Sequence, residues 1–178
     1  RDGAQPGHLD PEDVIMIRLG ICSVTLAEQT PQEVLQTAIE AGLQGIEWWG
    51  KDHVPHGDID TARRVGEQTR AAGLEVPSYG SYYRAGVSEA EGLTFDSILD
   101  TADALGAPMI RIWAGNQNGI EAEALHVQAV VDDTLRIADL AAARGISLTF
   151  EYHGGSLTDR NATAARFASQ VEHPNVFF

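Results

Sequence analysis

The segment Ile146–His153 alternates apolar and polar residues, as Ile-Ser-Leu-Thr-Phe-Glu-Tyr-His. Successive side chains of a strand point to opposite faces, so this pattern predicts a strand with one apolar face and one polar face. In a parallel sheet covered by helices on its outer side, the apolar face turns toward the helices and the polar face turns inward. Glu151 and His153 are therefore expected on the inner face near the end of this strand, and Tyr152 on the outer face.

Similar apolar runs recur along the chain, and each is followed by a turn and an amphipathic helix. The strands are predicted to begin near Arg18, Gly45, Glu75, Pro108, Ile146 and Asn175. Helices are predicted over residues 30–42, 60–73, 94–106, 123–145 and from about 161 onward. Their ends carry strong signals: Thr30 and Glu33 form a capping box, Thr94 is an N-cap, and Gly106 ends a helix.

Regular alternation of strands and helices predicts an α/β fold with parallel strands and right-handed crossovers. A doubly wound sheet is one solution, but the turn Ser23–Thr30 lacks a glycine-rich phosphate loop. A (β/α)8 TIM barrel is favoured, because several strands have inward-facing polar residues. The sequence contains about five βα units and a sixth strand, so we expect an incomplete barrel over residues 18–178, the front of a longer polypeptide. Residues 1–17 read as a polar N-terminal tail.

Composition narrows the function classes. The 178 residues are 43% hydrophobic and 21% charged, with a formal net charge of -14, which opposes nucleic-acid binding. No apolar run is long enough to predict a membrane span, and no secretory signal is visible at the start of the sequence. Cys22 is the single cysteine and has apolar neighbours, so we expect a small buried residue in a reducing, cytoplasmic setting.

Polar side chains of three strands are expected to meet inside the barrel. The same alternation turns Arg111 and Trp113 inward from the strand near Pro108, and Glu47 and Trp49 inward from the strand near Gly45. A buried guanidinium needs carboxylate partners, so Glu47, Arg111 and Glu151 are predicted to converge. This cluster can be a structural ion-pair network. It can also be an active site, because sites of this fold lie at the carboxyl ends of the strands.

Two further segments follow predicted strands. Lys51–Asp58 contains His53 and His56, and histidine can transfer protons near neutral pH or bind a metal, although each can equally be a solvated loop residue. Tyr79–Arg84 offers aromatic surfaces and an arginine suited to a polyol or phosphate, or forms an aromatic lid on the loop.

The sequence resembles the xylose isomerase-like barrel superfamily, and most closely its sugar phosphate isomerases and epimerases. The resemblance covers residues 18–178 and rests on five motifs taken as a series. These are Gly45-Ile-Glu-Trp-Trp-Gly, His53-Val-Pro-His-Gly-Asp, Ser78-Tyr-Gly-Ser-Tyr-Tyr-Arg, Arg111-Ile-Trp-Ala-Gly and Phe150-Glu-Tyr-His.

The resemblance implies a (β/α)8 barrel that holds a divalent cation (Mn, Mg, Co or Zn) through a glutamate, an acidic residue, a histidine and a second glutamate from successive later strands. Only Glu151 matches that ligand set, so most metal ligands are expected beyond residue 178. His153 matches a histidine that often follows the glutamate. His53 matches a histidine that members of the family place near the substrate.

These observations predict an enzyme, a metal-dependent isomerase or epimerase of a sugar or sugar phosphate that transfers a proton through an enediolate. Glu151, His153 and His53 are the expected catalytic residues, with Glu151 also a metal ligand. The expected substrate-binding residues are Trp49, Tyr82, Arg111 and Trp113. The alternatives are a non-catalytic barrel that binds a small polyol and an AP-endonuclease-like phosphodiesterase. The expected partner is a small-molecule sugar or sugar phosphate, with a homodimer as an option and neither nucleic acid nor a membrane.

Overall fold

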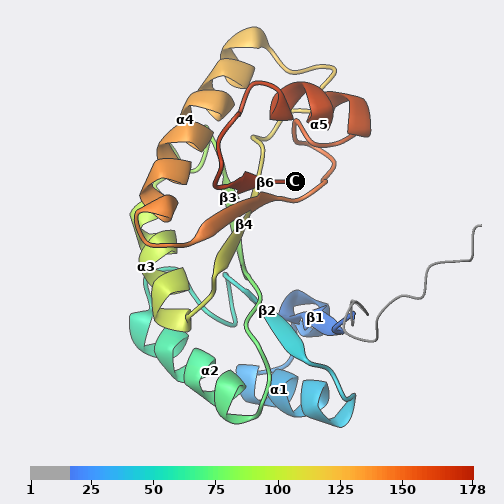
Figure 1. The fold of residues 1–178 in the computed structure, drawn as a ribbon, viewed down its shortest axis with the longest axis vertical. Coiled ribbons are helices and arrows are strands. Elements are labelled where there is room, and N and C mark those ends of the chain that lie inside the picture. The colour runs from blue at the N-terminus through green and yellow to red at the C-terminus, as the bar shows by residue number, and fades with distance from the viewer. Residues whose placement is uncertain (1–16) are drawn as a thin grey trace, which may run out of the picture.

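A computed structural model describes residues 17–178 as a six-stranded parallel sheet with helices along one side (Figure 1). The strand order β1-β2-β3-β4-β5-β6 follows the sequence, as the repeated unit predicts. The strands are β1 (Gly20–Cys22), β2 (Gly45–Trp49), β3 (Tyr79–Arg84), β4 (Met109–Trp113), β5 (Ser147–Phe150) and β6 (Val176–Phe177). The helices are η2 (Ser23–Leu26), α1 (Pro31–Glu40), α2 (Ile59–Ala71), α3 (Phe95–Leu105), α4 (Ala124–Ala142) and α5 (Asn161–Ala168).

The predicted helix ends are confirmed in atomic detail. Thr30 and Glu33 exchange the two hydrogen bonds of a capping box at the start of α1, because each side chain accepts from the other residue's backbone N–H. The Thr94 hydroxyl accepts from the Ser97 N–H at the start of α3. Gly106 ends α3 in the left-handed conformation, with φ of 75°, which glycine adopts without steric cost.

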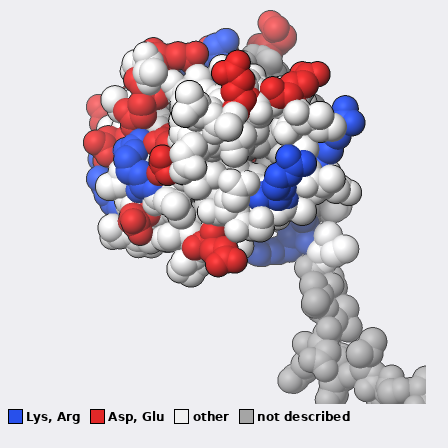
Figure 2. Space-filling model, turned by 90° about the horizontal axis from the view of Figure 1, so that it is seen from above, with Lys and Arg blue, Asp and Glu red and all other residues white. Residues whose placement is uncertain are grey.

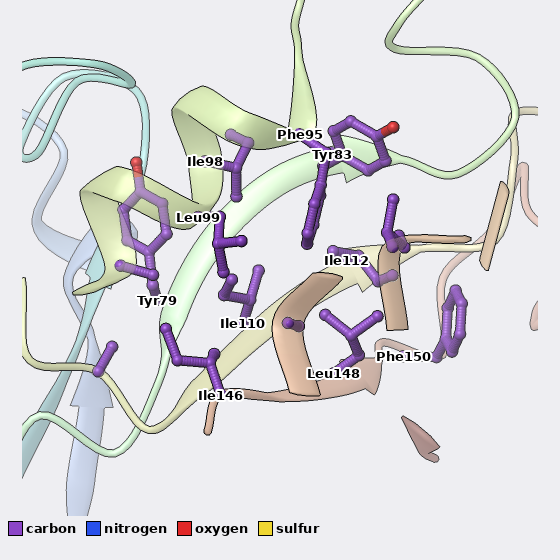
Figure 3. Packing of buried hydrophobic residues seen from close by; sticks show 14 of the residues in the cluster. Tyr79, Tyr83, Phe95, Ile98, Leu99, Ile110, Ile112, Ile146, Leu148 and Phe150 are labelled. Carbon is purple, nitrogen blue, oxygen red and sulfur yellow. The ribbon is translucent and has the colours of Figure 1, made fainter. Parts of the chain in front are cut away.

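The hydrophobic core lies between the sheet and its helices. Ile110, Ile112 and Leu148 alternate with polar neighbours on β4 and β5, and all three are fully buried on the outer face of the sheet. Figure 3 shows these side chains together with Phe95, Ile98 and Leu99 of α3. The polar residues that alternate with them on β4 and β5 therefore lie on the inner face of the sheet.

Two local predictions were wrong. The third strand begins at Tyr79 and not near Glu75, which forms only an isolated bridge with Gly45. Pro77 lies between these points and cannot donate a backbone hydrogen bond, so the ladder starts after it. The segment Tyr79–Arg84 is thus the strand itself and not the loop that follows it. Tyr152 was expected against the helices, but β5 ends at Phe150 and Tyr152 is 52% exposed.

The sequence contains 26 acidic and 12 basic residues, which gives the formal net charge of -14. In the view of Figure 2, charged side chains surround a central area of uncharged residues. None of the helices between residues 17 and 178 combines the length and apolar character that crossing a bilayer requires. The predicted tail, residues 1–17, lies outside the described residues except for Ile17.

Candidate active site

The inner face of the sheet brings three charged residues together from three strands. Arg111 of β4 contacts Glu47 of β2, with 3.0 Å from Nε and 2.9 Å from Nη2 to Glu47 Oε1. The other end of the guanidinium, Nη1, forms an ion pair with Oε2 of Glu151, directly after β5. The side chains of Arg111 and Glu47 are only 15% and 13% exposed. The predicted convergence of Glu47, Arg111 and Glu151 is confirmed.

The glycine of β3 allows this close approach. Gly80 lies between β2 and β4, paired with Trp49 on one side and with Arg111 on the other. A Cβ at this position would lie 2.9 Å from Arg111 Nη2 and 3.1 Å from Glu47 Oε1. Such contacts are too short for a carbon atom, so a side chain at position 80 would displace the ion pair.

The ionisation of Glu47 is set by opposing effects. Burial raises the pKa of Glu47, but hydrogen bonds and charge from Arg111, together with hydrogen bonds from Cys22 and Ser78, outweigh burial and lower the pKa overall. Glu47 is therefore a carboxylate at neutral pH.

Cys22 is not the buried residue that its apolar neighbours predicted. It is exposed on the inner face, opposite Glu47 in the β1–β2 register, and its Sγ donates a hydrogen bond of 2.8 Å to Glu47 Oε1. Desolvation and the neighbouring Glu47 raise the pKa of Cys22 to about 11. The thiol is therefore protonated at neutral pH, and thiolate nucleophilicity is suppressed.

Trp113 positions both polar residues that follow β5. Its indole Nε1 donates a hydrogen bond of 2.6 Å to Oε2 of Glu151. Its ring stacks on His153, with centroids 4.5 Å apart and an interplanar angle of 30°. Oε2 of Glu151 thus accepts from both Arg111 and Trp113, whereas Oε1 makes no hydrogen bond or ion pair with any residue in 17–178. Nδ1 of His153 is buried and has no partner among the same residues.

The aromatic rings form a continuous wall beside the carboxylates. The ring centroids of Trp49 and Tyr82 are 6.2 Å apart, and those of Tyr82 and Trp113 are 4.8 Å apart. Tyr82 has a φ of 59°, the only positive φ at a non-glycine residue in the part of the chain that the structure describes. Left-handed backbone in a bulky residue is strained and persists where the surrounding structure imposes it, often at functional sites.

These groups line one open hollow of about 400 Å³ on the inner face, called here the hollow. Its lining residues are Cys22, Val24, Glu47, Tyr82, Arg111, Trp113, Glu151 and His153. Five of the seven predicted site residues are therefore brought together: Tyr82, Arg111, Trp113, Glu151 and His153. Trp49 stands beside Tyr82 at the edge of this group.

The structure does not bring His53 to the hollow. His53 is 2% exposed, its Nδ1 lies 2.8 Å from the Ser23 hydroxyl, and its Nε2 lies 3.0 Å from the Gln29 carbonyl oxygen. Both ring nitrogens are thus occupied, and burial lowers the pKa of His53. Ser23 also accepts from the Trp49 N–H, so in this arrangement His53 supports the wall without facing a substrate.

His56 is likewise used within the protein. Its Nδ1 lies 2.7 Å from the Tyr79 hydroxyl, which donates to the carbonyl oxygen of Val54. Burial lowers the pKa of His56 to about 4, so the imidazole is neutral at physiological pH. The hydrogen bond between His56 and Tyr79 therefore holds the loop that follows β2 against β3.

The described residues do not by themselves fit a divalent metal. No group of three or more histidine, cysteine, aspartate or glutamate side chains within residues 17–178 is arranged to hold a metal ion. Glu151 contributes one carboxylate, and its Oε2 is already engaged by a guanidinium. A single carboxylate oxygen falls short of the four to six ligands that such ions take.

Sequence reasoning missed two contributors to the site, Cys22 and Ser78, which donate hydrogen bonds to Glu47. Arg84, suggested by the sequence as a group that binds a polyol or phosphate, lies over the Trp113 ring with Cζ 4.4 Å from its centroid. The signal for Cys22 was present, because the alternation of β1 places it opposite Ile21 and on the face of Glu47. The contact of Arg84 depends on the bend of β3 near Tyr82, which no residue pattern indicated.

The chain is similar to known proteins in both sequence and structure. A curated 3-dehydroshikimate dehydratase of Bacillus anthracis is 22% identical over 171 residues, which cover 90% of this chain and 60% of that protein. The crystal structure of a probable 3-DHS dehydratase, AsbF, from the same organism superposes with a TM-score of 0.76 at 21% identity, covering 90% of this chain and 61% of that one.

Two further structures share the fold at lower similarity. The D-allulose 3-epimerase from Methylomonas sp. and the IOLI protein with a bound zinc atom each have a TM-score of 0.69 and 18% identity, covering 90% of this chain and 61% of theirs. The chain thus spans about three fifths of the length of these proteins. At these identities the structures establish the fold, an incomplete (β/α)8 barrel, and not the reaction.

The family match extends over most of the chain. The family described as xylose isomerase-like TIM barrel matches residues 35–178, which include β2 to β6 and every carboxylate of the hollow. The chain therefore belongs to the xylose isomerase-like TIM barrel family, as the motifs had indicated.

Proposed function

We propose that the complete protein is an isomerase or epimerase of a small sugar or sugar phosphate. The reaction begins with removal of a proton from the carbon next to a carbonyl group. The observation that supports this proposal is the Glu151 carboxylate at the carboxyl end of β5. It is anchored through Oε2 and retains Oε1 without a partner among residues 17–178. A base must be positioned and still have a free lone pair, and this carboxylate meets both conditions.

In this proposal Oε1 of Glu151 takes the proton and the electron pair of the C–H bond forms an enediolate. Delivery of a proton to the opposite face by a second acid, from the rest of the complete protein, gives an epimer, and return of the proton by Glu151 to the neighbouring carbon gives an isomer. The Arg111 guanidinium, 15% exposed, stabilises the negative charge that develops nearby. His153 lines the hollow beside Glu151 and contacts a substrate hydroxyl, and Trp49, Tyr82 and Trp113 contact the carbon skeleton. His53 acts as a positioning residue through Ser23.

A divalent metal in the complete protein would polarise the carbonyl and the adjacent hydroxyl. If Glu151 is one of its ligands, as the family resemblance implies, it would have to bind through Oε1, because Oε2 is held by Arg111 and Trp113, and another residue of the complete protein would then be the base. The zinc atom in the IOLI structure is compatible with metal use in this family. Because residues 17–178 do not complete a metal site, no step above is routed through the metal.

A dehydratase is the second candidate, favoured by the curated relative named 3-dehydroshikimate dehydratase. Its chemistry begins with the same proton removal next to a carbonyl. The electron pair then expels a hydroxyl group from the neighbouring carbon as water, with a proton supplied by an acid such as His153. The geometry of Glu151 serves both reactions, so substrate structure and the remaining part of the protein decide between them.

The test uses the full-length protein in deuterium oxide with a panel of ketoses, their phosphate esters and 3-dehydroshikimate. The isomerase or epimerase reading predicts loss of the proton NMR signal next to the carbonyl, with new sugar signals. The dehydratase reading predicts a product that has lost one water by mass spectrometry. Glu151→Gln abolishes either reaction, whereas the exposed control Glu172→Gln retains it. Absence of exchange and of water loss across the panel would overturn the proposal.

A further inference from the structure

The backbone that carries Glu151 and His153 lies beyond the regular part of the sheet. Strand β5 ends at Phe150, and only the Glu151 N–H continues the ladder, by donating to the Ile112 carbonyl oxygen of β4 at 3.1 Å. No backbone N–H within residues 17–178 donates to the carbonyl oxygen of Glu151 or of His153. The sheet therefore fixes where this segment begins, but it does not hold these two carbonyl groups.

Two buried hydroxyl groups donate to these carbonyl oxygens instead. The Thr158 hydroxyl donates to the Glu151 carbonyl oxygen at 2.7 Å, and the Ser156 hydroxyl donates to the His153 carbonyl oxygen at 2.7 Å. The Ser156 oxygen also accepts from the Thr158 N–H at 3.2 Å. Both Ser156 and Thr158 are 0% exposed among residues 17–178, so these contacts are complete within this part of the chain.

The loop that carries the two hydroxyl groups is itself attached to the end of β4. Leu157, which lies between them and is 3% exposed, donates its N–H to the Ala114 carbonyl oxygen at 2.8 Å. The Gly155 N–H donates to Asn118 Oδ1 in the loop after β4, also at 2.8 Å. The last residue of β4 is Trp113, so one strand supports both the side chains that follow β5 and, through this loop, their backbone.

Glu151 is therefore held at both ends. Its Oε2 accepts from Trp113 Nε1 at 2.6 Å, and its carbonyl oxygen accepts from the Thr158 hydroxyl at 2.7 Å. A carbon atom approaches a carbonyl oxygen no closer than about 3.3 Å, so a methyl group in place of this hydroxyl would lengthen the contact by about 0.6 Å. Such a displacement is large for a reacting group, because a misplacement of about 1 Å can reduce a rate by about 100-fold.

We propose that Thr158 and Ser156 are positioning residues, whose hydroxyl groups fix the backbone of Glu151 and His153 and so set the direction of both side chains. The inference deepens the proposed function and rests on it for the effect on catalysis. It holds whether Glu151 is the base or a metal ligand, because either role needs a carboxylate of fixed direction. Neither hydroxyl group lines the hollow, so its effect on a reaction is transmitted through the backbone.

The indole N–H of Trp113 reports the position of the Glu151 carboxylate without any substrate. It can be followed by NMR in the full-length protein with isotope-labelled tryptophan, where Trp113→Phe identifies the signal. We expect Thr158→Val to move the signal toward that of an indole without an acceptor and to speed its exchange with deuterium oxide at least about tenfold. Thr158→Ser keeps the hydroxyl group and should retain the wild-type signal. An unchanged signal in Thr158→Val overturns the inference.

Thr69→Val is the matched control for this substitution. Thr69 of α2 is also 0% exposed, and its hydroxyl donates to the Val65 carbonyl oxygen at 2.7 Å and accepts from Trp48 Nε1 at 3.1 Å. Thr69→Val therefore removes the same group from a different part of the core, and we expect it to shift the Trp48 signal and leave the Trp113 signal unchanged. Equal shifts of the Trp113 signal in Thr69→Val and Thr158→Val would indicate general loosening and reject the positioning role.

Ser156→Ala tests the second hydroxyl group, and it adds no bulk, so it also tests the inference if Thr158→Val does not fold. The ring of His153 stacks on Trp113 with centroids 4.5 Å apart, so the signals of its ring protons carry the ring-current shift of the indole. We expect this shift to decrease in Ser156→Ala, because the His153 carbonyl group loses its donor. The same ring-current shift in Ser156→Ala and wild type would contradict the inference.

Catalysis supplies the last measurement and separates the two proposals. With a substrate identified from the panel above, kcat of Thr158→Val should fall at least about tenfold with KM nearly constant, whereas Thr158→Ser and Thr69→Val should keep the wild-type kcat. The expected NMR changes, without deuterium exchange by the wild type on any compound, support the positioning role and reject the proposed reaction. Exchange at the full wild-type rate in Thr158→Val supports the reaction and rejects the positioning role.

Discussion

Replacing Arg111 by methionine tests whether the ion-pair cluster holds the inner face of the barrel together. The substitution keeps an unbranched apolar stem but leaves Glu47 and Glu151 as facing carboxylates without their common cation. Removing one partner of a buried ion pair costs about 3–5 kcal/mol. The side chain of Glu151 is 33% exposed and regains solvent, so we expect a loss of about 3 kcal/mol of unfolding free energy at pH 7.

The loss should depend on pH in a defined direction. The pKa of Glu47 is lowered in the folded protein, so its stabilising contribution is present above the unfolded value of about 4.3 and is lost as pH falls through the folded value. Without Arg111, burial raises the pKa of Glu47 instead. As pH falls, Glu47 is therefore protonated in the variant before it is protonated in the wild type, which removes the unpaired charge. The difference in unfolding free energy between the two proteins should then shrink to about 1 kcal/mol near pH 4.

Urea unfolding of the full-length protein, followed by circular dichroism between pH 4 and pH 8, measures this difference. Arg63→Met is the matched control, because Arg63 is 56% exposed and, among residues 17–178, forms an ion pair with Asp60 alone, on the same helix, so its loss should stay below about 0.5 kcal/mol. The reasoning is refuted if Arg111→Met is no more destabilising than Arg63→Met, or if its penalty is undiminished at pH 4.

Three further predictions follow from single contacts. Glu151→Gln should reduce deuterium exchange at the substrate carbon by at least about 100-fold, measured by NMR, with an unchanged circular dichroism spectrum; residual exchange near the wild-type rate would remove Glu151 as the base. Trp113→Phe keeps the stacking ring but loses the 2.6 Å hydrogen bond to Glu151, so kcat should fall about tenfold with KM nearly constant; a change confined to KM would contradict a positioning role. Gly66→Ala would place a Cβ 2.1 Å from the Leu105 carbonyl oxygen, so we expect thermal unfolding to show a loss of more than about 2 kcal/mol in unfolding free energy. The same change at Gly154, whose added Cβ would meet no atom within 4 Å, should be nearly neutral.

Much of the fold could be predicted because the relevant signals are local. The alternation in Ile146–His153 reports which side chains face the helices, and the capping box at Thr30 reports where α1 begins, without any knowledge of distant residues. The third strand was misplaced because Tyr79–Arg84 has no simple alternation. Tyr79, Gly80, Ser81 and Tyr83 are all buried, so burial does not alternate along this strand either.

The candidate site was predictable to the extent that it depends on strand faces. Burial of a guanidinium requires carboxylates, and this requirement joins Arg111 to Glu47 and Glu151 from the sequence alone. The position of His53 outside the hollow could not be predicted in this way, because it depends on the hydrogen bonds that Ser23 and Gln29 make with its two ring nitrogens. The conformation of Tyr82 was also hidden, since a positive φ in tyrosine has no residue signature and is imposed by its neighbours.

The arrangement of the site depends on the absence of a side chain at Gly80 of β3. Glu47 on β2 and Arg111 on β4 are separated by β3, so any inward side chain between them would interrupt the ion pair. Gly80 occupies that point, and the bend of β3 two residues later turns Tyr82 toward Trp113. The same short segment therefore leaves room for the guanidinium and supplies the aromatic wall. Because Arg111 then reaches both neighbouring carboxylates, Glu151 is held by one oxygen and presents the other, which is the condition for a base that is both positioned and free to react.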